Sequence, residues 1–167
     1  MAYPICPPTV RKYGWCGVLA LVYALGLLMP HTEAAFDELL LSMQRILGKT
    51  KAAWRRSTNR ERNTKRGGIS LNETKLVLEH YRSRCGYAVE YGHKRNVNAW
   101  LKTRPTTGKY IVHTGKHAIF VHVPVVRGRW KIYDQSGARQ RKDLAQMKGR
   151  GGLLLQKVHA IVTVVDK

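Results

Sequence analysis

Three residues of the types used in nucleophilic catalysis lie at the ends of expected helices and strands. Cys16 follows an extended, proline-containing opening and begins an apolar stretch expected to be helical. A thiol at a helix N-terminus lies at the positive end of the helix dipole, which lowers its pKa. His117 begins an expected strand after a glycine turn, and Asp134 ends the next expected strand. In an antiparallel pair the end of one strand lies beside the start of its neighbour, so Asp134 can reach the His117 ring.

A thiolate, an imidazole and an orienting carboxylate are the groups that nucleophilic acyl chemistry requires. Taken alone, Cys16 would be interpreted as a small hydrophobic residue beside a buried helix. His117 and Asp134 favour the catalytic interpretation. His122 is the second choice for the base, although His113 and His122 alternate with apolar residues as ordinary sheet residues do. The histidines show no metal-site spacing, so no metal and no other cofactor are expected.

The elements that must position these residues fall into a helical half and a strand half. The expected helices cover residues 15–29, 32–47, 70–85 and 96–102, and the expected strands cover 87–91, 110–113, 117–126, 129–133 and 158–165. Thr32 is a candidate N-cap, and Ser70 with Glu73 forms a capping box. Helices followed by an antiparallel sheet predict an α+β fold, and the length suits one domain over residues 1–167.

The order of these short motifs resembles that of the papain-like cysteine peptidases, especially their compact bacterial and viral members. Trp-Cys-Gly at 15–17 is similar to the nucleophile motif, Lys-His-Ala at 116–118 to the histidine motif, and Tyr-Asp at 133–134 to the third-residue motif. The resemblance implies a papain-like fold. In it, N-terminal helices carrying the cysteine pack on a C-terminal antiparallel sheet carrying the histidine and the aspartate. It also implies hydrolysis of peptide or isopeptide bonds in a protein or peptide substrate.

One part of the family pattern is missing. The family normally has a Gln five or six residues before the nucleophile, where its amide helps hold the oxyanion, but Val10 and Arg11 occupy those positions. Losing one oxyanion donor costs a factor of about 10² to 10³ in rate. The candidate replacements, beside the backbone N–H of the nucleophile, are Arg11, Lys12, the Tyr13 hydroxyl and Gly17.

The charge is unusual for a globular domain. The chain has 30 Lys and Arg against 10 Asp and Glu, a formal net charge of +20. Such a surplus predicts a polyanionic partner, most often nucleic acid, with an acidic protein as the alternative. The densest cluster lies in a basic excursion at residues 49–68, and a second lies nearer the C-terminus. The candidate phosphate-binding residues are Arg55, Arg56, Arg60, Arg62, Lys65, Arg66, Arg139, Arg141 and Lys142. With no base-reading motif, binding should be nonspecific and salt-dependent.

These features favour a cysteine peptidase associated with a nucleic-acid-containing particle, such as a viral or phage virion. The leading alternative is an inactive papain-like structural component of a virion or ribonucleoprotein that binds nucleic acid through its basic surface, and the missing Gln favours it. A third interpretation is a plain nucleic-acid-binding protein in which the positions of Cys16 and His117 are coincidental.

The cysteine content bears on the compartment. Cys6, Cys16 and Cys85 form no C-x-x-C pair, which argues against a disulfide framework. An intracellular reducing compartment or a virion interior is therefore expected, rather than secretion. The apolar run at 17–29 is too short for a membrane span. Its rival interpretation as a signal peptide excludes the catalytic one, because cleavage would remove Cys16.

Overall fold

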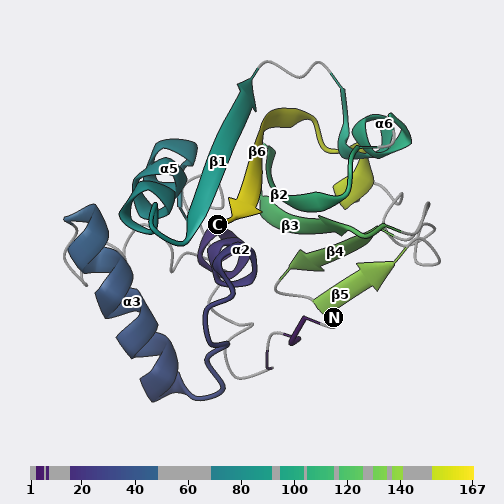
Figure 1. The fold of residues 1–167 in the computed structure, drawn as a ribbon. Helices are drawn as coiled ribbons and strands as arrows, with labels where there is room; N and C mark the ends of the chain where they lie inside the picture. The colour runs from purple at the N-terminus through teal and green to yellow at the C-terminus, as the bar shows by residue number, and fades with distance from the viewer. Residues whose placement is uncertain are drawn as a thin grey trace.

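The computed structural model describes residues 3–5, 7, 16–48, 69–91, 95–103, 105–114, 117–125, 130–134, 137–140 and 152–167, with the backbone alone for Asp134 and residues 137–140. The described elements are α2 (Cys16–Leu25), α3 (Glu33–Leu47), α5 (Leu71–His80), β1 (Cys85–Tyr91), α6 (Val97–Lys102), β2 (Gly108–Thr114), β3 (Ala118–Val123), β4 (Lys131–Asp134), β5 (Gly137–Gln140), the 3₁₀ helix η2 (Leu153–Leu155) and β6 (Val158–Asp166). The predicted α+β fold is confirmed, because the longer helices come first and the sheet second (Figure 1).

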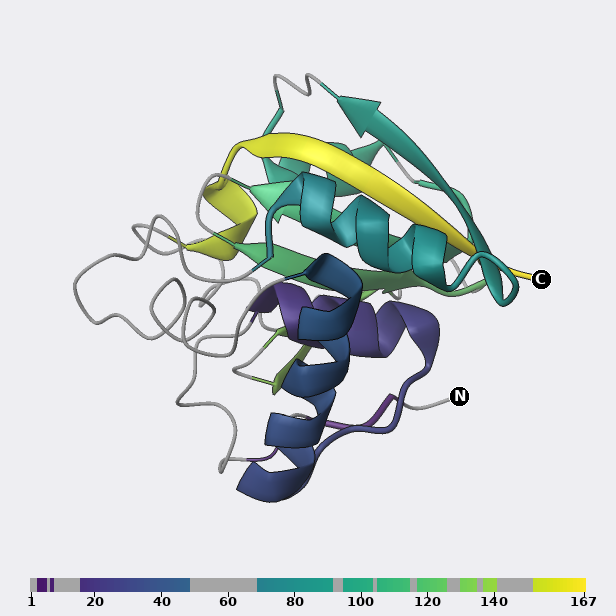
Figure 2. The ribbon, with the colours of Figure 1, turned by 90° about the vertical axis from the view of Figure 1, so that its left-hand side faces the viewer.

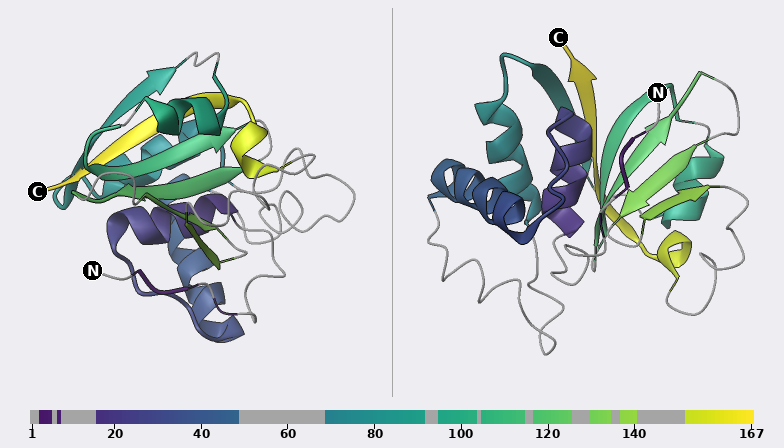
Figure 3. Two further views of the ribbon diagram at one scale, coloured as in Figure 1. Left: turned by 90° about the vertical axis from the view of Figure 1, so that its right-hand side faces the viewer. Right: turned by 90° about the horizontal axis from the view of Figure 1, so that it is seen from below.

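The described strands form one antiparallel sheet in the order β1-β6-β2-β3-β4-β5. Successive side chains of a strand point to opposite faces, so each central strand contributes to two cores. Ile111 and Phe120 belong to the core shared with α2, α3 and α5, whereas Val112 and Ile119 belong to the core shared with α6 and η2. Figure 3 shows the sheet between these two groups of helices.

Helix α2 is apolar on every side because it is enclosed. All ten of its residues are buried, and it packs on β2, β3 and β4. A helix that is hydrophobic all round belongs in the interior of a protein. Figure 2 looks onto the helical layer, with α2, α3 and α5 in front of the sheet. The N-terminus of the enclosed helix is where Cys16 lies.

The predicted helix signals are present. The Thr32 side chain accepts a hydrogen bond from the backbone of Ala35 and caps the start of α3. At the other end, Gly48 follows the last helical residue with a φ of 64°. Ser70 and Glu73 form both hydrogen bonds of the predicted capping box at the start of α5. These bonds satisfy N–H groups that a helix start would otherwise leave without a partner.

Some predicted boundaries were wrong. Helix α2 ends at Leu25, because Gly26 adopts a φ of 62° and turns the chain before Pro30 is reached. Strand β5 was missed, because the sequence analysis assigned residues 137–140 to no element, whereas they form a hairpin with β4. The basic excursion at 49–68 lies outside the described residues. In the part of the chain that is described, no helix is long and apolar enough to cross a membrane.

Candidate active site

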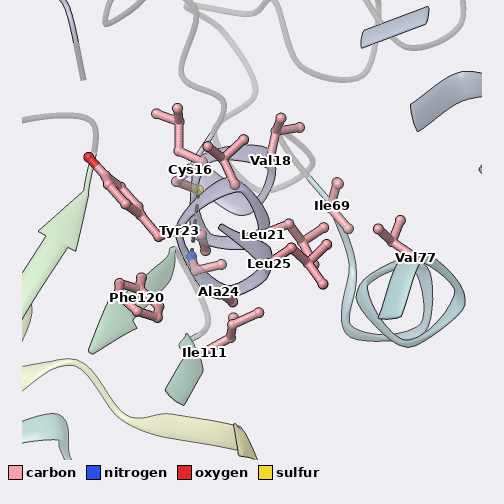
Figure 4. Close-up of a cluster of buried hydrophobic side chains, with 14 of the residues drawn as sticks. Cys16, Val18, Leu21, Tyr23, Ala24, Leu25, Ile69, Val77, Ile111 and Phe120 are labelled. Atoms are coloured by element: carbon pink, nitrogen blue, oxygen red, sulfur yellow. Dashed lines mark hydrogen bonds between the residues drawn. The ribbon is translucent and has the colours of Figure 1, made fainter. Parts of the chain in front are cut away.

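The N-terminus of α2 meets the start of β3. Cys16 is the first residue of α2, and its Sγ lies 3.5 Å from the backbone nitrogen of Ala118, the first residue of β3. Figure 4 draws this contact as a dashed line from the sulfur atom. Because Ala118 directly follows His117, the fold brings the predicted nucleophile beside the chain segment that carries the predicted base.

The Cys16 sulfur has two neighbours that interact favourably with negative charge. The Ala118 backbone N–H is in position to donate to Sγ. Cys16 is also the first residue of α2, at the positive end of the helix dipole. Cys16 as a whole residue is 8% exposed and belongs to the buried core that α2 shares with the sheet.

Gly17 allows a second element to approach Cys16 closely. A Cβ placed on Gly17 would lie 2.9 Å from the backbone nitrogen of Ile69 and 3.0 Å from its Cβ. Ile69 immediately precedes the capping box of α5 and is buried. The small residue after the cysteine therefore has a packing role, because it lets the start of α5 rest against the start of α2.

His117 is exposed and directly precedes β3, three residues after Thr114, the last residue of β2. Its carbonyl oxygen accepts a hydrogen bond from the Thr114 backbone N–H at 2.8 Å. Its own backbone N–H donates to Thr114 Oγ1 at 2.9 Å. The main chain of His117 is thus held on both sides by one residue of the neighbouring strand.

Asp134 stands at the end of β4, which pairs with β3 in the predicted antiparallel sense. The pairing places Tyr133 opposite Phe120. Asp134 is the next residue along β4, so its backbone lies toward the end of the sheet at which β3 begins. The side chain of Asp134 is outside the described part, and its role in orienting the His117 ring stays a prediction.

A buried histidine near the site was not expected from the sequence to have a special role. His113 lies on β2 opposite Ala118, is 7% exposed, and its Nε2 is 3.2 Å from Thr74 Oγ1 on α5. The Thr74 hydroxyl donates to the Ser70 carbonyl, so His113 Nε2–H is the donor to Thr74. Burial lowers the pKa of His113 to about 4. The sequence predicted an ordinary sheet residue at this position, and nothing local indicated its burial or its partner on α5.

His122, the second choice for the base, lies well away from Cys16. It is four residues beyond Ala118 on β3, which is about 13 Å along a strand. Its pKa is lowered by burial, and further by the N-terminal amine, Lys109 and Lys131. The Tyr3 ring packs against it edge-on, with 5.2 Å between the ring centroids. His122 is therefore a packed sheet residue in this fold.

Several predicted site residues lie outside the described part of the chain. They are the oxyanion candidates Arg11, Lys12 and Tyr13 and the basic residues Arg55, Arg56, Arg60, Arg62, Lys65, Arg66, Arg141 and Lys142. Arg139 lies on β5, where the backbone alone is described. Most of the chain's Lys and Arg residues fall in the segments that are not described. Among the described residues, no group of three His, Cys, Asp or Glu side chains could hold a metal ion.

Comparison with known proteins supports the fold. No protein-family model matches the chain, and no curated protein matches its sequence. Among solved structures, the chain is similar to the peptidase domain of Streptococcus ComA, a bi-functional ABC transporter involved in a quorum-sensing pathway. The TM-score is 0.51 at 11% sequence identity, over 99% of this chain and 100% of that domain. The α+β fold of this chain is therefore papain-like, as the sequence motifs predicted.

Proposed function

We propose that this chain is a cysteine peptidase that hydrolyses peptide or isopeptide bonds, with Cys16 as nucleophile, His117 as base and Asp134 as the residue that orients the imidazole. The observation that carries the proposal is the contact between Cys16 Sγ and the Ala118 backbone nitrogen, 3.5 Å apart, which joins the helix start to the residue after His117. The papain-like fold supports the same assignment.

The reaction follows from these groups. The Cys16 thiolate attacks the carbonyl carbon, and the His117 imidazolium donates its proton to the amine that leaves, giving a thioester. Water then attacks the thioester while His117 accepts its proton, and the carboxylic acid leaves as the thiolate is restored. The first-turn N–H groups of α2 are directed out of the helix start and supply donors for the oxyanion. Arg11, Lys12 or Tyr13 is proposed as the second donor in place of the missing Gln.

The net positive charge of the chain supports binding to a polyanion. A net charge of +20 is far beyond what solubility requires. We therefore place the peptidase on a nucleic-acid-containing particle, such as a virion, where it binds phosphates without sequence preference. Affinity for a random-sequence duplex DNA should fall by orders of magnitude between about 50 and 200 mM salt. Affinity that does not change with salt would contradict this part of the proposal.

A second candidate is a papain-like structural component without activity that binds nucleic acid through the same basic surface. Val10 and Arg11, in the positions of the oxyanion Gln, favour it. In that case Cys16 would serve only as a packed side chain at the helix start, and the chain would bind nucleic acid without cleaving any peptide.

Cleavage of a mixed peptide library tests the two candidates. The full chain, its Cys16→Ser variant and a Cys85→Ser control are incubated with the library, and new peptide termini are identified by mass spectrometry. The peptidase proposal requires new termini with the full chain and with Cys85→Ser, but none with Cys16→Ser. Equal patterns for all three proteins would favour the structural component.

A further inference from the structure

The hydroxyl of Thr114 links His117 to a residue that sequence reasoning did not single out. Thr114 Oγ1 accepts the His117 backbone N–H at 2.9 Å and lies 2.7 Å from Gln156 Oε1. The His117 carbonyl oxygen is also within reach of the hydroxyl, but at the longer distance of 3.2 Å. A hydroxyl has one proton, so the shorter contact assigns the O–H to Gln156. The result is a relay from Gln156 through Thr114 to the main chain of His117.

An irregularity in the sheet brings Gln156 into this relay. The β2–β6 pairing places His113 opposite Ala160 but Thr114 opposite Val158, so His159 is an extra residue on β6. Such a β-bulge shifts the register by one residue and re-aims the side chains beyond it, often beside an active site. Without the shift Thr114 would lie opposite His159.

The shift decides which residue lies diagonal to Thr114. Paired residues share a face of the sheet, and residues two apart in extended chain also share one. Gln156 precedes Val158 by two residues and has extended backbone, with φ −70° and ψ 136°. Gln156 is therefore the diagonal neighbour of Thr114, within reach of a long side chain. In the unshifted register Lys157 would take that place, and its ammonium could not accept the hydroxyl proton.

Gln156 is itself held firmly. Its carbonyl oxygen accepts the Val97 backbone N–H at 3.1 Å, and its own N–H donates to the Leu153 carbonyl at 3.2 Å. The flanking residue Val158 is bonded to the Arg95 carbonyl at 2.9 Å. The relay therefore connects the His117 turn to α6 and η2, on the face of the sheet opposite to α2.

We infer that Thr114 and Gln156 are positioning residues that hold the turn carrying His117 in register with Cys16. The inference rests on the proposed peptidase site and adds two residues to its supporting structure. The contacts described for Thr114 reach the main chain of His117. The two residues act through the His117 main chain, whose N–H and C=O both bond to Thr114.

Alkylation of Cys16 by iodoacetamide across pH, resolved by mass spectrometry, tests this inference in the full chain. Thr114→Val keeps the shape of the side chain but removes the hydroxyl, and should lower the Cys16 rate near pH 6 about five-fold or more. Thr114→Ser keeps the hydroxyl and should return the rate to within about two-fold of the unaltered protein. Gln156→Met removes the acceptor and should lower the rate in the same direction.

Cys85 serves as the internal control for folding, because it is buried at the start of β1, far from the turn that carries His117. Its alkylation rate should be the same in all four proteins. A Cys16 rate that is unchanged in both Thr114→Val and Gln156→Met, while the unaltered protein reacts readily near pH 6, would overturn the inference and leave the peptidase proposal standing. An unaltered protein whose Cys16 reacts only as an ordinary thiol would overturn the proposed function, and the inference with it.

Discussion

Cys16 Sγ and the Ala118 backbone nitrogen, 102 residues apart in the sequence, lie within 3.5 Å of each other. This contact fixes the N-terminus of α2 against the start of β3. The other end of α2 is also held, because Lys109 Nζ donates to the Ala24 carbonyl at 3.0 Å. Helix α2 is thus held against the sheet at both ends, and the position of Cys16 depends on those two contacts and on its neighbours in the helical layer.

The close approach at Gly17 makes it intolerant of a side chain. Gly17→Ala places a Cβ 2.9 Å from the Ile69 backbone nitrogen, and backbone cannot move aside as a flexible side chain does. We expect the free energy of unfolding, measured by urea titration, to fall by about 1–3 kcal/mol. The start of α5 should shift away from α2, and Cys16 should react more slowly with iodoacetamide.

Gly86→Ala is the matched control for Gly17→Ala. A Cβ at Gly86 meets no atom within 4 Å. Its unfolding free energy should change by no more than about 0.5 kcal/mol. Similar losses in the two variants would mean that the contact with Ile69 is not the cause.

Lys109 supports the C-terminus of α2. Its ammonium donates to the Ala24 carbonyl and forms an ion pair with Asp166, and the side chain is only 15% exposed. A cation at a helix C-terminus also interacts favourably with the helix dipole. Lys109→Met should lower the free energy of unfolding by about 1–3 kcal/mol in urea titration.

Lys75→Met is the matched control for Lys109→Met, because it removes the same positive charge from a different position. The Lys75 ammonium bonds to the Tyr91 hydroxyl at 3.2 Å in an exposed contact. Exposed pairs of this kind contribute little. Equal destabilisation by the two variants would refute a specific role for Lys109 at the helix end.

The buried His113 predicts acid sensitivity. Its pKa is about 4 in the folded chain, because burial disfavours the imidazolium, against about 6.5 when unfolded. Between those values the unfolded chain binds a proton that the folded chain does not. The stability that comes from keeping His113 neutral is therefore fully present above about pH 6.5. It is lost progressively as the pH drops toward 4, by about 3 kcal/mol at most. Urea titrations at a series of pH values measure this loss.

His113→Gln isolates the contribution of this group, because a Gln amide can donate to Thr74 Oγ1 as Nε2–H does but does not titrate. The difference in unfolding free energy between the two proteins should change steadily between about pH 6.5 and 4. A difference that stays constant across that range would show that His113 does not titrate as its burial requires.

The fold could be predicted largely from local sequence signals. The all-apolar run after Cys16, the cap at Thr32 and the capping box at Ser70 each depend on residues within a few positions, and the structure contains all three. Alternating apolar residues indicated most strands for the same reason. Strand β5 was missed because its four residues, Gly-Ala-Arg-Gln, give this edge strand no apolar face to reveal it.

The supporting residues of the site could not be predicted, because they depend on register. Gln156 meets Thr114 only through the bulge at His159, and His113 meets Thr74 only once α5 packs on the sheet. No spacing in the sequence encodes either contact. The assignment of Cys16, His117 and Asp134 came from a pattern that the sequence does contain, the chain order of the family that it resembles, and the assignment stays a prediction.

The most direct test of the proposed site is the rate of Cys16 alkylation against pH, in the full chain and in His117→Ala. Cys85 provides the reference within the same molecule, since burial raises its pKa and it should react slowly until the pH is high. A nucleophile paired with His117 should react well below pH ~7, and that reactivity should disappear in His117→Ala. A Cys16 that titrates near the ordinary value of ~8.5, with the same profile in both proteins, would contradict the catalytic assignment.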